Sequence, residues 1–324
     1  MISSLTHKTK QFFFVLIKLS VVLAAFYFIY HKLTKNTQLS FPDFIDFLSK
    51  NQVFSIKNSS FLIVLSLFNW FFEIFKWKIL VLPLKKINFI TATQQSLASL
   101  TASLFTPNRI GEYGAKAMYY HANLRKQIMG VNLLSNTLQM AVTCILGSIG
   151  FVFFTVQHQI NTNYHKLAVA FTFLCCSILI VIYILKHKKL KNKWFSFNKL
   201  KQALSNYPKS NLSSGLLLSL IRYAIFSFQL YILLHFFGVN ISYFTAMPAI
   251  TTMYLVASII PSIFIFDVVV KGSIAVYIFA FLQVNHIIVL SVVTLMWLLN
   301  FVLPSIVGSY YVISYKLPKQ TVNT

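Results

Sequence analysis

Apolar segments long enough to cross a bilayer occupy most of this chain and restrict it to the folds that a membrane accepts. Hydrophobic residues make up 57% of the 324 residues, charged residues make up only 10%, and the mean hydropathy is +0.71. Soluble domains do not have this composition. We therefore predict an all-α, polytopic integral membrane protein with about 6–8 transmembrane helices.

Positive charge lies mostly in short loops between the apolar segments. The 28 lysines and arginines outnumber the five acidic residues and give a net charge of +23. In a soluble protein this excess would suggest nucleic acid, but no soluble module here carries a basic stripe, so we predict no nucleic-acid partner. The loop lysines indicate a multi-pass protein of the cell (cytoplasmic) membrane with both termini in the cytoplasm.

The sequence contains no pattern that holds a metal or a cofactor. The eight histidines lack ligand spacing, and no P-loop, Gly-x-Ser-x-Gly or His-Glu-x-x-His motif is present. Cys144, Cys175 and Cys176 fall within apolar segments, which argues against a disulfide framework. We predict no cofactor, no metal and no enzymatic activity.

The apolar segments form two membrane halves joined by a basic linker. Residues 1–185 are the first half, 186–210 is a cytoplasmic linker rich in lysine, and 211–324 is the second half. Segment 31–58 has a partly apolar face and is expected to lie in the membrane interface. The predicted apolar helices are 12–30, 60–82, 90–105, 108–122, 128–156, 166–185, 212–237, 244–260, 264–283 and 287–314.

Each half contains one helix pair that is broken at a proline. Pro107 breaks the pair near 90–122, and Pro261 breaks the pair near 244–283. An acid and a base four residues apart follow each proline. The loop lysines place the ends of the first pair in the cytoplasm and the ends of the second pair outside, which predicts an inverted repeat.

The first broken pair has a charged face. One side of its second helix carries Arg109, Glu112, Tyr113 and Lys116. A charge in hydrocarbon costs roughly 2.5–3.5 kcal/mol, so membrane proteins place one there mainly for function. Free N–H groups at the helix start and the planar guanidinium of Arg109 suit a phosphate, which Lys116 would also bind, while Glu112 would orient the cations.

The second broken pair places Asp267 and Lys271 on one face, either as an opposing gate or as an ion pair that pins two helices. Three bases and two acids in the two pairs leave one positive charge, which suits an anionic ligand. Arg222 either lines the same cavity or reaches the interface. Glu73 is expected to pair on the surface with Lys76 at a cytoplasmic helix end.

Small and polar residues precede the first break. Ala98 and Ala102 have the spacing that allows close packing of membrane helices. Gln94 and Gln95 belong to the same segment, and their side chains either pack between helices or line a cavity.

Three motifs carry a family resemblance. The run Thr-Pro-Asn-Arg-Ile-Gly-Glu, which ends at Glu112, is similar to a Pro-Gly-Arg-x-Gly-Glu motif, and Lys-Trp-Lys-Ile-Leu from Lys76 is similar to a basic-Trp-basic-Leu signature. The stretch from Pro261 to Ser273 is similar to a late proline-rich motif. Together they resemble the lysylphosphatidylglycerol synthase transmembrane-region family, a flippase-like, UPF0104-type membrane domain, over nearly the whole chain.

The resemblance implies a multi-span domain that binds or translocates lipids between leaflets. By motif it implies roles for Arg109 and Glu112 and, through the late motif, for Asp267 and Lys271. The sequence departs from the family pattern at Asn108, where glycine is usual, and it lacks the glycine-rich element of the late motif.

The leading hypothesis is translocation of phospholipid or lipid-linked phosphate, with membrane lipids that carry an anionic headgroup or a polyprenyl phosphate as partners. The alternative is a non-transporting subunit that presents a lipid to a partner enzyme for lipid modification or glycosylation. A membrane glycosyltransferase is a third class, whose catalytic acids would be Asp43 and Asp46.

Overall fold

The computed structural model describes residues 55–104, 106, 109–159, 207–259 and 264–315, with side chains in the last range from residue 270 onward. All regular elements in these residues are helical, which confirms the predicted all-α class. Several sequence-based expectations fall on residues outside this description: the helices 12–30 and 166–185, nearly all of segment 31–58, most of the linker, Asp43, Asp46, Pro107 and Pro261.

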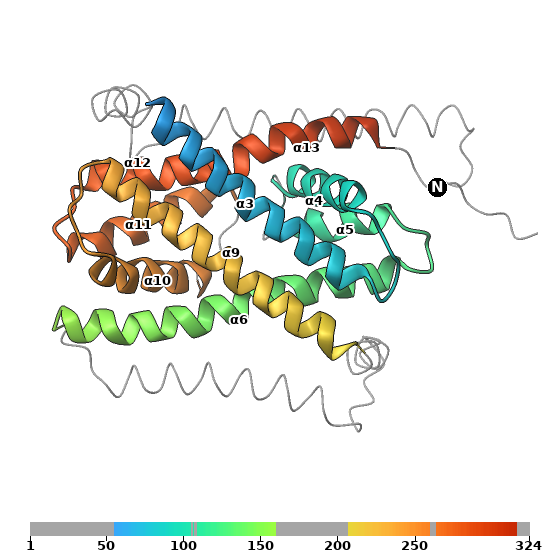
Figure 1. Ribbon diagram of the computed structural model, residues 1–324, viewed down its shortest axis with the longest axis horizontal. Helices are drawn as coiled ribbons and strands as arrows, with labels where there is room; N and C mark the ends of the chain where they lie inside the picture. Colours follow the sequence, from blue (N-terminus) through green and yellow to red (C-terminus); the bar gives the residue numbers. More distant parts are fainter. Residues whose placement is uncertain (1–54, 105, 107–108, 160–206, 260–263, 316–324) are drawn as a thin grey trace, which may run out of the picture.

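The helices begin and end within a few residues of their predicted limits (Figure 1). They are α3 (Ile56–Val81), α4 (Phe89–Ser103), α5 (Ile110–Met118), α6 (Arg125–Gln157), α9 (Lys209–Phe236), α10 (Tyr243–Ile259), α11 (Phe264–Ala280), α12 (His286–Trp297), the π-helix η2 (Leu298–Val302) and α13 (Leu303–Ser314). Helices α3, α6 and α9 and the continuous run α12–η2–α13 are long and apolar enough to cross a membrane. Helix α10 and the described apolar part of α11 are shorter.

Short polar side chains begin several of these helices. Ser55, Asn88 and Asn285 each accept a hydrogen bond from a backbone N–H of the first turn, at 3.3, 2.7 and 2.8 Å. Such caps satisfy N–H groups that a helix start leaves without an internal partner. The caps therefore fix where α3, α4 and α12 leave their loops.

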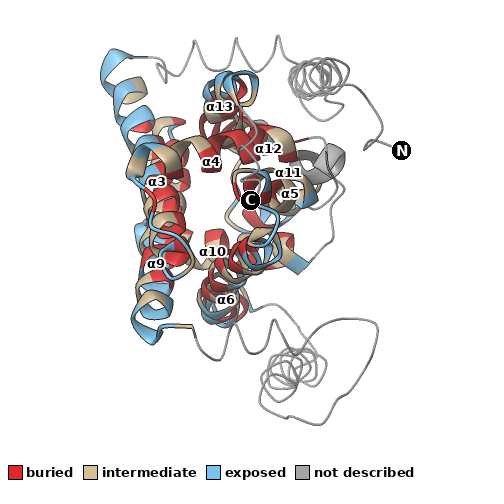
Figure 2. Cartoon of the chain, turned by 90° about the vertical axis from the view of Figure 1, so that its right-hand side faces the viewer, coloured by how far each residue is buried: buried red, intermediate tan, exposed pale blue. Residues whose placement is uncertain are grey.

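Helices from the two predicted halves pack crosswise. Helix α3 lies along α9, while α4 packs against α13 of the other half and α10 packs against α6 of the other half (Figure 1). Figure 2 shows exposed residues on the outer sides of α3 and α9 and buried residues toward the centre. The largest apolar core lies among α9, α10, α11 and α12, and a second core surrounds Trp77 on α3.

Glycines on the long helices allow both crossings. A Cβ at Gly308 of α13 would lie 2.2 Å from the Leu97 carbonyl oxygen of α4. A Cβ at Gly150 of α6 would lie 1.8 Å from Thr251 Oγ1 of α10. Each short helix therefore approaches its partner at a distance that only glycine permits there.

Candidate functional site

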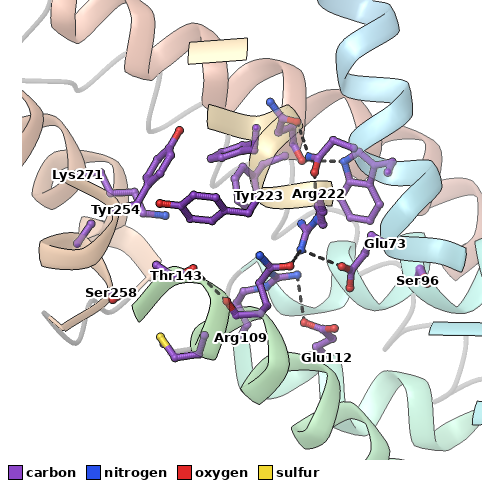
Figure 3. A pocket seen from close by; sticks show the side chains of 18 of the residues that line it. Glu73, Ser96, Arg109, Glu112, Thr143, Arg222, Tyr223, Tyr254, Ser258 and Lys271 are labelled. Carbon is purple, nitrogen blue, oxygen red and sulfur yellow. Dashed lines mark hydrogen bonds and ion pairs between the residues drawn. The ribbon is translucent and has the colours of Figure 1, made fainter. Parts of the chain in front are cut away.

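A cavity of about 630 Å³ lies among helices of both halves (Figure 3). Side chains from α3, α4, α5, α6, α9, α10, α11 and η2 line it. This volume is within the range of small-molecule sites in proteins. Six of the lining residues are ionisable acids and bases: Glu73, Arg109, Glu112, Lys116, Arg222 and Lys271.

Three charges of α5 form a chain on one helix face, as their spacing predicts. Arg109 Nη2 lies 3.1 Å from Glu112 Oε2, and Lys116 Nζ lies 2.8 Å from Glu112 Oε1. The side chains of Glu112 and Lys116 are 5% and 1% exposed, whereas that of Arg109 is 35% exposed. Arg109 is therefore the member of this chain with the most surface for a ligand.

The backbone at Arg109 is in an uncommon conformation. Arg109 caps α5 with φ 57° and ψ 30°, in the left-handed region that residues with a side chain rarely adopt. The Gly111 N–H at the helix start donates to Thr106 Oγ1 at 2.9 Å. One of the N–H groups that the sequence predicts to be free is thus already bonded, which leaves fewer backbone donors at this helix start than the sequence predicts.

Lys116 is held by protein groups on three sides. Besides Glu112, its Nζ donates to Asn132 Oδ1 of α6 at 2.8 Å and lies 4.2 Å from the centre of the Trp77 ring. A cation over an indole face is electrostatically favourable. These contacts use most of the capacity of the ammonium group, so Lys116 mainly fixes Glu112 within the site.

The basic-Trp-basic stretch of α3 packs against the Lys116 ammonium group through Trp77. Trp77 is fully buried, and its Nε1 donates to Gln95 Oε1 of α4 at 2.8 Å, an oxygen that also accepts from the Tyr120 hydroxyl at 2.9 Å. Of the two readings left open for Gln95, packing between helices is the observed one.

Tyr113 is not among the cavity-lining residues, and its hydroxyl accepts from Asn136 Nδ2 of α6 at 3.1 Å.

Glu73 corrects a sequence-based prediction. It does not pair on the surface: it is 7% exposed, lines the cavity, and binds buried Lys76 at 2.8 Å. The same Oε2 lies 2.8 Å from Arg222 Nη1 of α9, which answers the open question of Arg222: the guanidinium lines the cavity. An ion pair thus joins the two halves at the site.

A sequence signal for Glu73 was present. Ser66, Asn69, Glu73 and Lys76 follow one another at three- and four-residue intervals, so they form a polar stripe along an otherwise apolar helix. All four are buried. The surface prediction came from the position of Glu73 and Lys76 near a cytoplasmic loop, because a lysine near a loop usually faces the lipid headgroups.

Buried amides continue from Arg222 into the helix bundle. Arg222 Nε donates to Asn69 Oδ1 at 3.0 Å, and Asn69 Nδ2 donates to Asn300 Oδ1 at 2.8 Å. Asn300 then donates to Gln229 Oε1 at 3.0 Å. Asn300 lies in η2, and its carbonyl oxygen accepts from Trp70 Nε1 at 3.0 Å. We call these residues the amide chain; π-helical turns of this kind are common at functional sites.

The second broken pair contributes Lys271 to the cavity. Its Nζ lies 5.8 Å from the centre of the Phe301 ring of η2. Asp267 belongs to α11, but its side chain lies outside the described part of the structure. The acid-to-base pairing predicted for this helix therefore stays a prediction.

Cations outnumber carboxylates among the described lining residues. Arg109, Lys116 and Arg222 face two carboxylates around the cavity, and buried Lys76 adds a fourth positive charge next to Glu73, before Lys271 is counted. A desolvated excess of positive charge is unfavourable unless an anion or water balances it. The described part of the site therefore has the electrostatics of an anion-binding cavity.

The comparisons with known proteins agree with the architecture. The family model described as the lysylphosphatidylglycerol synthase TM region matches residues 15–308 of the 324. No curated protein and no solved structure matches the chain significantly.

Proposed function

Because this chain belongs to the lysylphosphatidylglycerol synthase transmembrane-region family, whose members have lipid-related roles in membranes, we propose that it moves a phospholipid or lipid-linked phosphate between leaflets. The observation behind this proposal is the cavity with four cations and two carboxylates among its described lining. The proposed location is the cell membrane, with both termini in the cytoplasm. We propose that the protein does this without catalysing a reaction and without a cofactor.

Two arginines are the proposed headgroup ligands. Arg109 is 35% exposed and Arg222 is 22% exposed, and each binds a carboxylate through one of its terminal nitrogens. A guanidinium has five donors in a planar fork, so Arg109 can hold a carboxylate and still grip a phosphate. Arg222 also donates Nε to Asn69 and Nη1 to Gln139 Oε1 at 3.4 Å, so its Nη2 is the group that would meet the phosphate. Glu112 and Glu73 would keep the two guanidinium groups in place, and Lys116 would in turn hold Glu112.

The cavity lowers the barrier that a headgroup meets in the bilayer. Each exposed charge at mid-bilayer costs roughly 2.5–3.5 kcal/mol or more, and a cationic cavity replaces hydrocarbon with paired charge along that path.

We propose that residues 1–185 and 211–324 are inverted halves that rock about the cavity, with 186–210 as the linker. The crosswise packing of α4 on α13 and of α10 on α6 supports that proposal.

One observation favours the second candidate, a lipid-presenting subunit. The Glu73–Arg222 ion pair and the amide chain join α3 to α9 and η2 through buried groups. Buried networks with satisfied partners rigidify the structure around them. A rigid bundle would present its lipid to a partner enzyme rather than carry it across.

Leaflet-to-leaflet movement of labelled lipids in proteoliposomes separates the two candidates. We expect wild type to move anionic lipids, and expect Arg109→Ala and Glu112→Gln to lose that movement. Lys126→Ala is the control, because this lysine is exposed at the start of α6 and does not line the cavity. Folded wild-type protein that binds anionic lipid but moves none would contradict translocation and select the lipid-presenting subunit.

A further inference from the structure

The cavity has an aromatic end that the phosphate site does not use. Tyr254 and Lys271 lie away from the carboxylates of Glu73 and Glu112, and Tyr223 lies next to Tyr254 (Figure 3). Phe226 and Phe301 also line the cavity. The Tyr223 and Tyr254 rings meet edge to face at 6.0 Å, and Phe226 lies 5.3 Å from Tyr254. A phosphate alone fills only part of a cavity of about 630 Å³.

Two tyrosine hydroxyls at this end make no hydrogen bond within the described part of the chain. Tyr223 is 6% exposed, and neither its hydroxyl nor that of Tyr254 makes a hydrogen bond to the described residues. Buried hydroxyls without a partner are costly and uncommon in native structures. Their position at a cavity wall indicates groups that a ligand would satisfy.

The same end also offers acceptors. Thr143 donates its hydroxyl proton to Gln139 O at 3.1 Å, and Ser258 donates to Leu255 O at 2.7 Å. Each hydroxyl oxygen therefore keeps lone pairs for a ligand donor. A ligand group here must both donate and accept hydrogen bonds, which hydroxyls do, whereas an ammonium only donates and a phosphate dianion only accepts.

Charge argues against a cationic group at the aromatic end. Aromatic faces attract ammonium groups, but Lys271 already places an ammonium 5.8 Å from the Phe301 ring. A choline, ethanolamine or lysyl group would find that ring face already occupied, and it would meet the excess of cations that Arg109, Lys116 and Arg222 give the described lining. A neutral ring with hydroxyls avoids this repulsion between cations, and its apolar faces pack on aromatic side chains.

We propose that the cavity accepts a phosphate that carries a neutral, polyhydroxylated ring. The phosphate lies at the Arg109 and Arg222 end, and the ring lies against Tyr223 and Tyr254. An inositol phospholipid and a prenyl phosphate linked to a hexose share this chemistry. The inference rests on the proposed function in taking the ligand to be a membrane lipid, and it names the class of headgroup.

Binding to the purified full chain in detergent tests this proposal, with thermal stabilisation as the readout. The probes are dioctanoyl phosphatidic acid, phosphatidylinositol and phosphatidylcholine, together with farnesyl phosphate and farnesyl phosphoryl glucose. We expect each ring-bearing phosphate to bind roughly five- to tenfold more tightly than its ring-free partner, and phosphatidylcholine to bind most weakly. Comparison of the inositol arm with the hexose arm identifies the source of the ring.

The Tyr223→Phe/Tyr254→Phe double variant tests the assigned residues. Each substitution removes one oxygen and keeps the ring, so we expect the preference for ring-bearing probes to fall to about twofold or less. Tyr231→Phe is the matched control, because this tyrosine of α9 does not line the cavity and its hydroxyl donates to Ile241 O at 3.4 Å. It should keep the wild-type preference.

Three results would overturn the proposal: equal binding of ring-bearing and ring-free phosphates by wild type, an unchanged preference in the double variant, or tightest binding of phosphatidylcholine. Failure of the proposed function would look different. If the protein prefers ring-bearing phosphates but moves no lipid in proteoliposomes, the result contradicts translocation and supports the headgroup assignment.

Discussion

The two broken helix pairs have the same packing but different chemistry. Helix α4 meets α13 at Gly308, and helix α10 meets α6 at Gly147 and Gly150, so each pair is anchored on the opposite half by glycine. In the first pair, α5 brings a carboxylate between two cations into the cavity. In the second pair, the described lining residues are apolar side chains, Tyr254 and Ser258 of α10, and Lys271 of α11. The comparison teaches that glycine-based packing alone does not determine which side chains a helix pair brings to the cavity.

Loss of Arg109 should have the largest functional effect and separate the chemistry of the first pair from its packing. Arg109→Asn removes the guanidinium, while asparagine tolerates the left-handed backbone that this position needs. We expect loss of lipid movement in proteoliposomes and a free energy of unfolding within about 1 kcal/mol of the wild-type value. Retained movement by this variant would contradict the headgroup role.

Loss of Glu73 should cost the most stability. Glu73→Ala leaves Lys76 buried and without its carboxylate, and removal of one partner from a buried pair costs about 3–5 kcal/mol. Denaturation in detergent measures this. Glu73→Leu with Lys76→Met should recover part of the loss, because an apolar pair of similar volume replaces the ions. A loss below about 1 kcal/mol in Glu73→Ala would show that the pair is not desolvated.

The glycine crossings should differ in their tolerance of a methyl group. Gly308→Ala places Cβ against a backbone oxygen, which cannot turn away, whereas Gly150→Ala meets the Thr251 side chain. We expect losses of about 1–3 kcal/mol for both, with the larger loss at Gly308. Gly114→Ala is the control, because nothing lies within 4 Å of its added Cβ. Equal and negligible losses at both crossings would refute glycine-dependent packing.

The smallest effect is expected at the amide chain, which belongs to neither broken pair. Trp70→Phe keeps a six-membered aromatic ring but removes the pyrrole ring with its Nε1 donor to Asn300 O. We expect the lost hydrogen bond to contribute about 0.5–1.5 kcal/mol to the loss in thermal denaturation, in addition to the lost packing of the larger ring. Trp297→Phe is the comparison, because its Nε1 is buried and makes no hydrogen bond to the described residues. Its loss should be smaller than that of Trp70→Phe.

Periodicity and composition predict much of this fold. The apolar stretch predicted at 128–156 is α6 at 125–157, and the breaks near Pro107 and Pro261 separate α4 from α5 and α10 from α11. These features are local, because a helix needs only its own backbone and an apolar surface to form in a membrane. The i, i+3 and i, i+4 pairs of Arg109, Glu112 and Lys116 are local in the same sense.

Contacts between distant segments were beyond the reach of the sequence. The Arg222–Glu73 pair joins residues far apart in the chain, and Asn69 bonds Asn300 across 231 positions. No spacing rule links such residues, so the polar stripe of α3 could indicate that Glu73 is buried but not that Arg222 is its partner. The aromatic end was missed for another reason. Tyrosines in an apolar helix look like packing residues until the structure shows that their hydroxyls make no hydrogen bond to the residues it describes.

Crosswise packing also has a consequence for biosynthesis. Thr101 of α4 donates to Ser305 O of α13, a residue that follows it by 204 positions. At about 5–20 residues per second, α4 waits roughly 10–40 s in the membrane before its partner helix exists. During that interval Glu73 has Lys76 but not Arg222. The nascent first half must therefore be an incomplete folding unit, and two separately expressed halves should become stable only when they are made together.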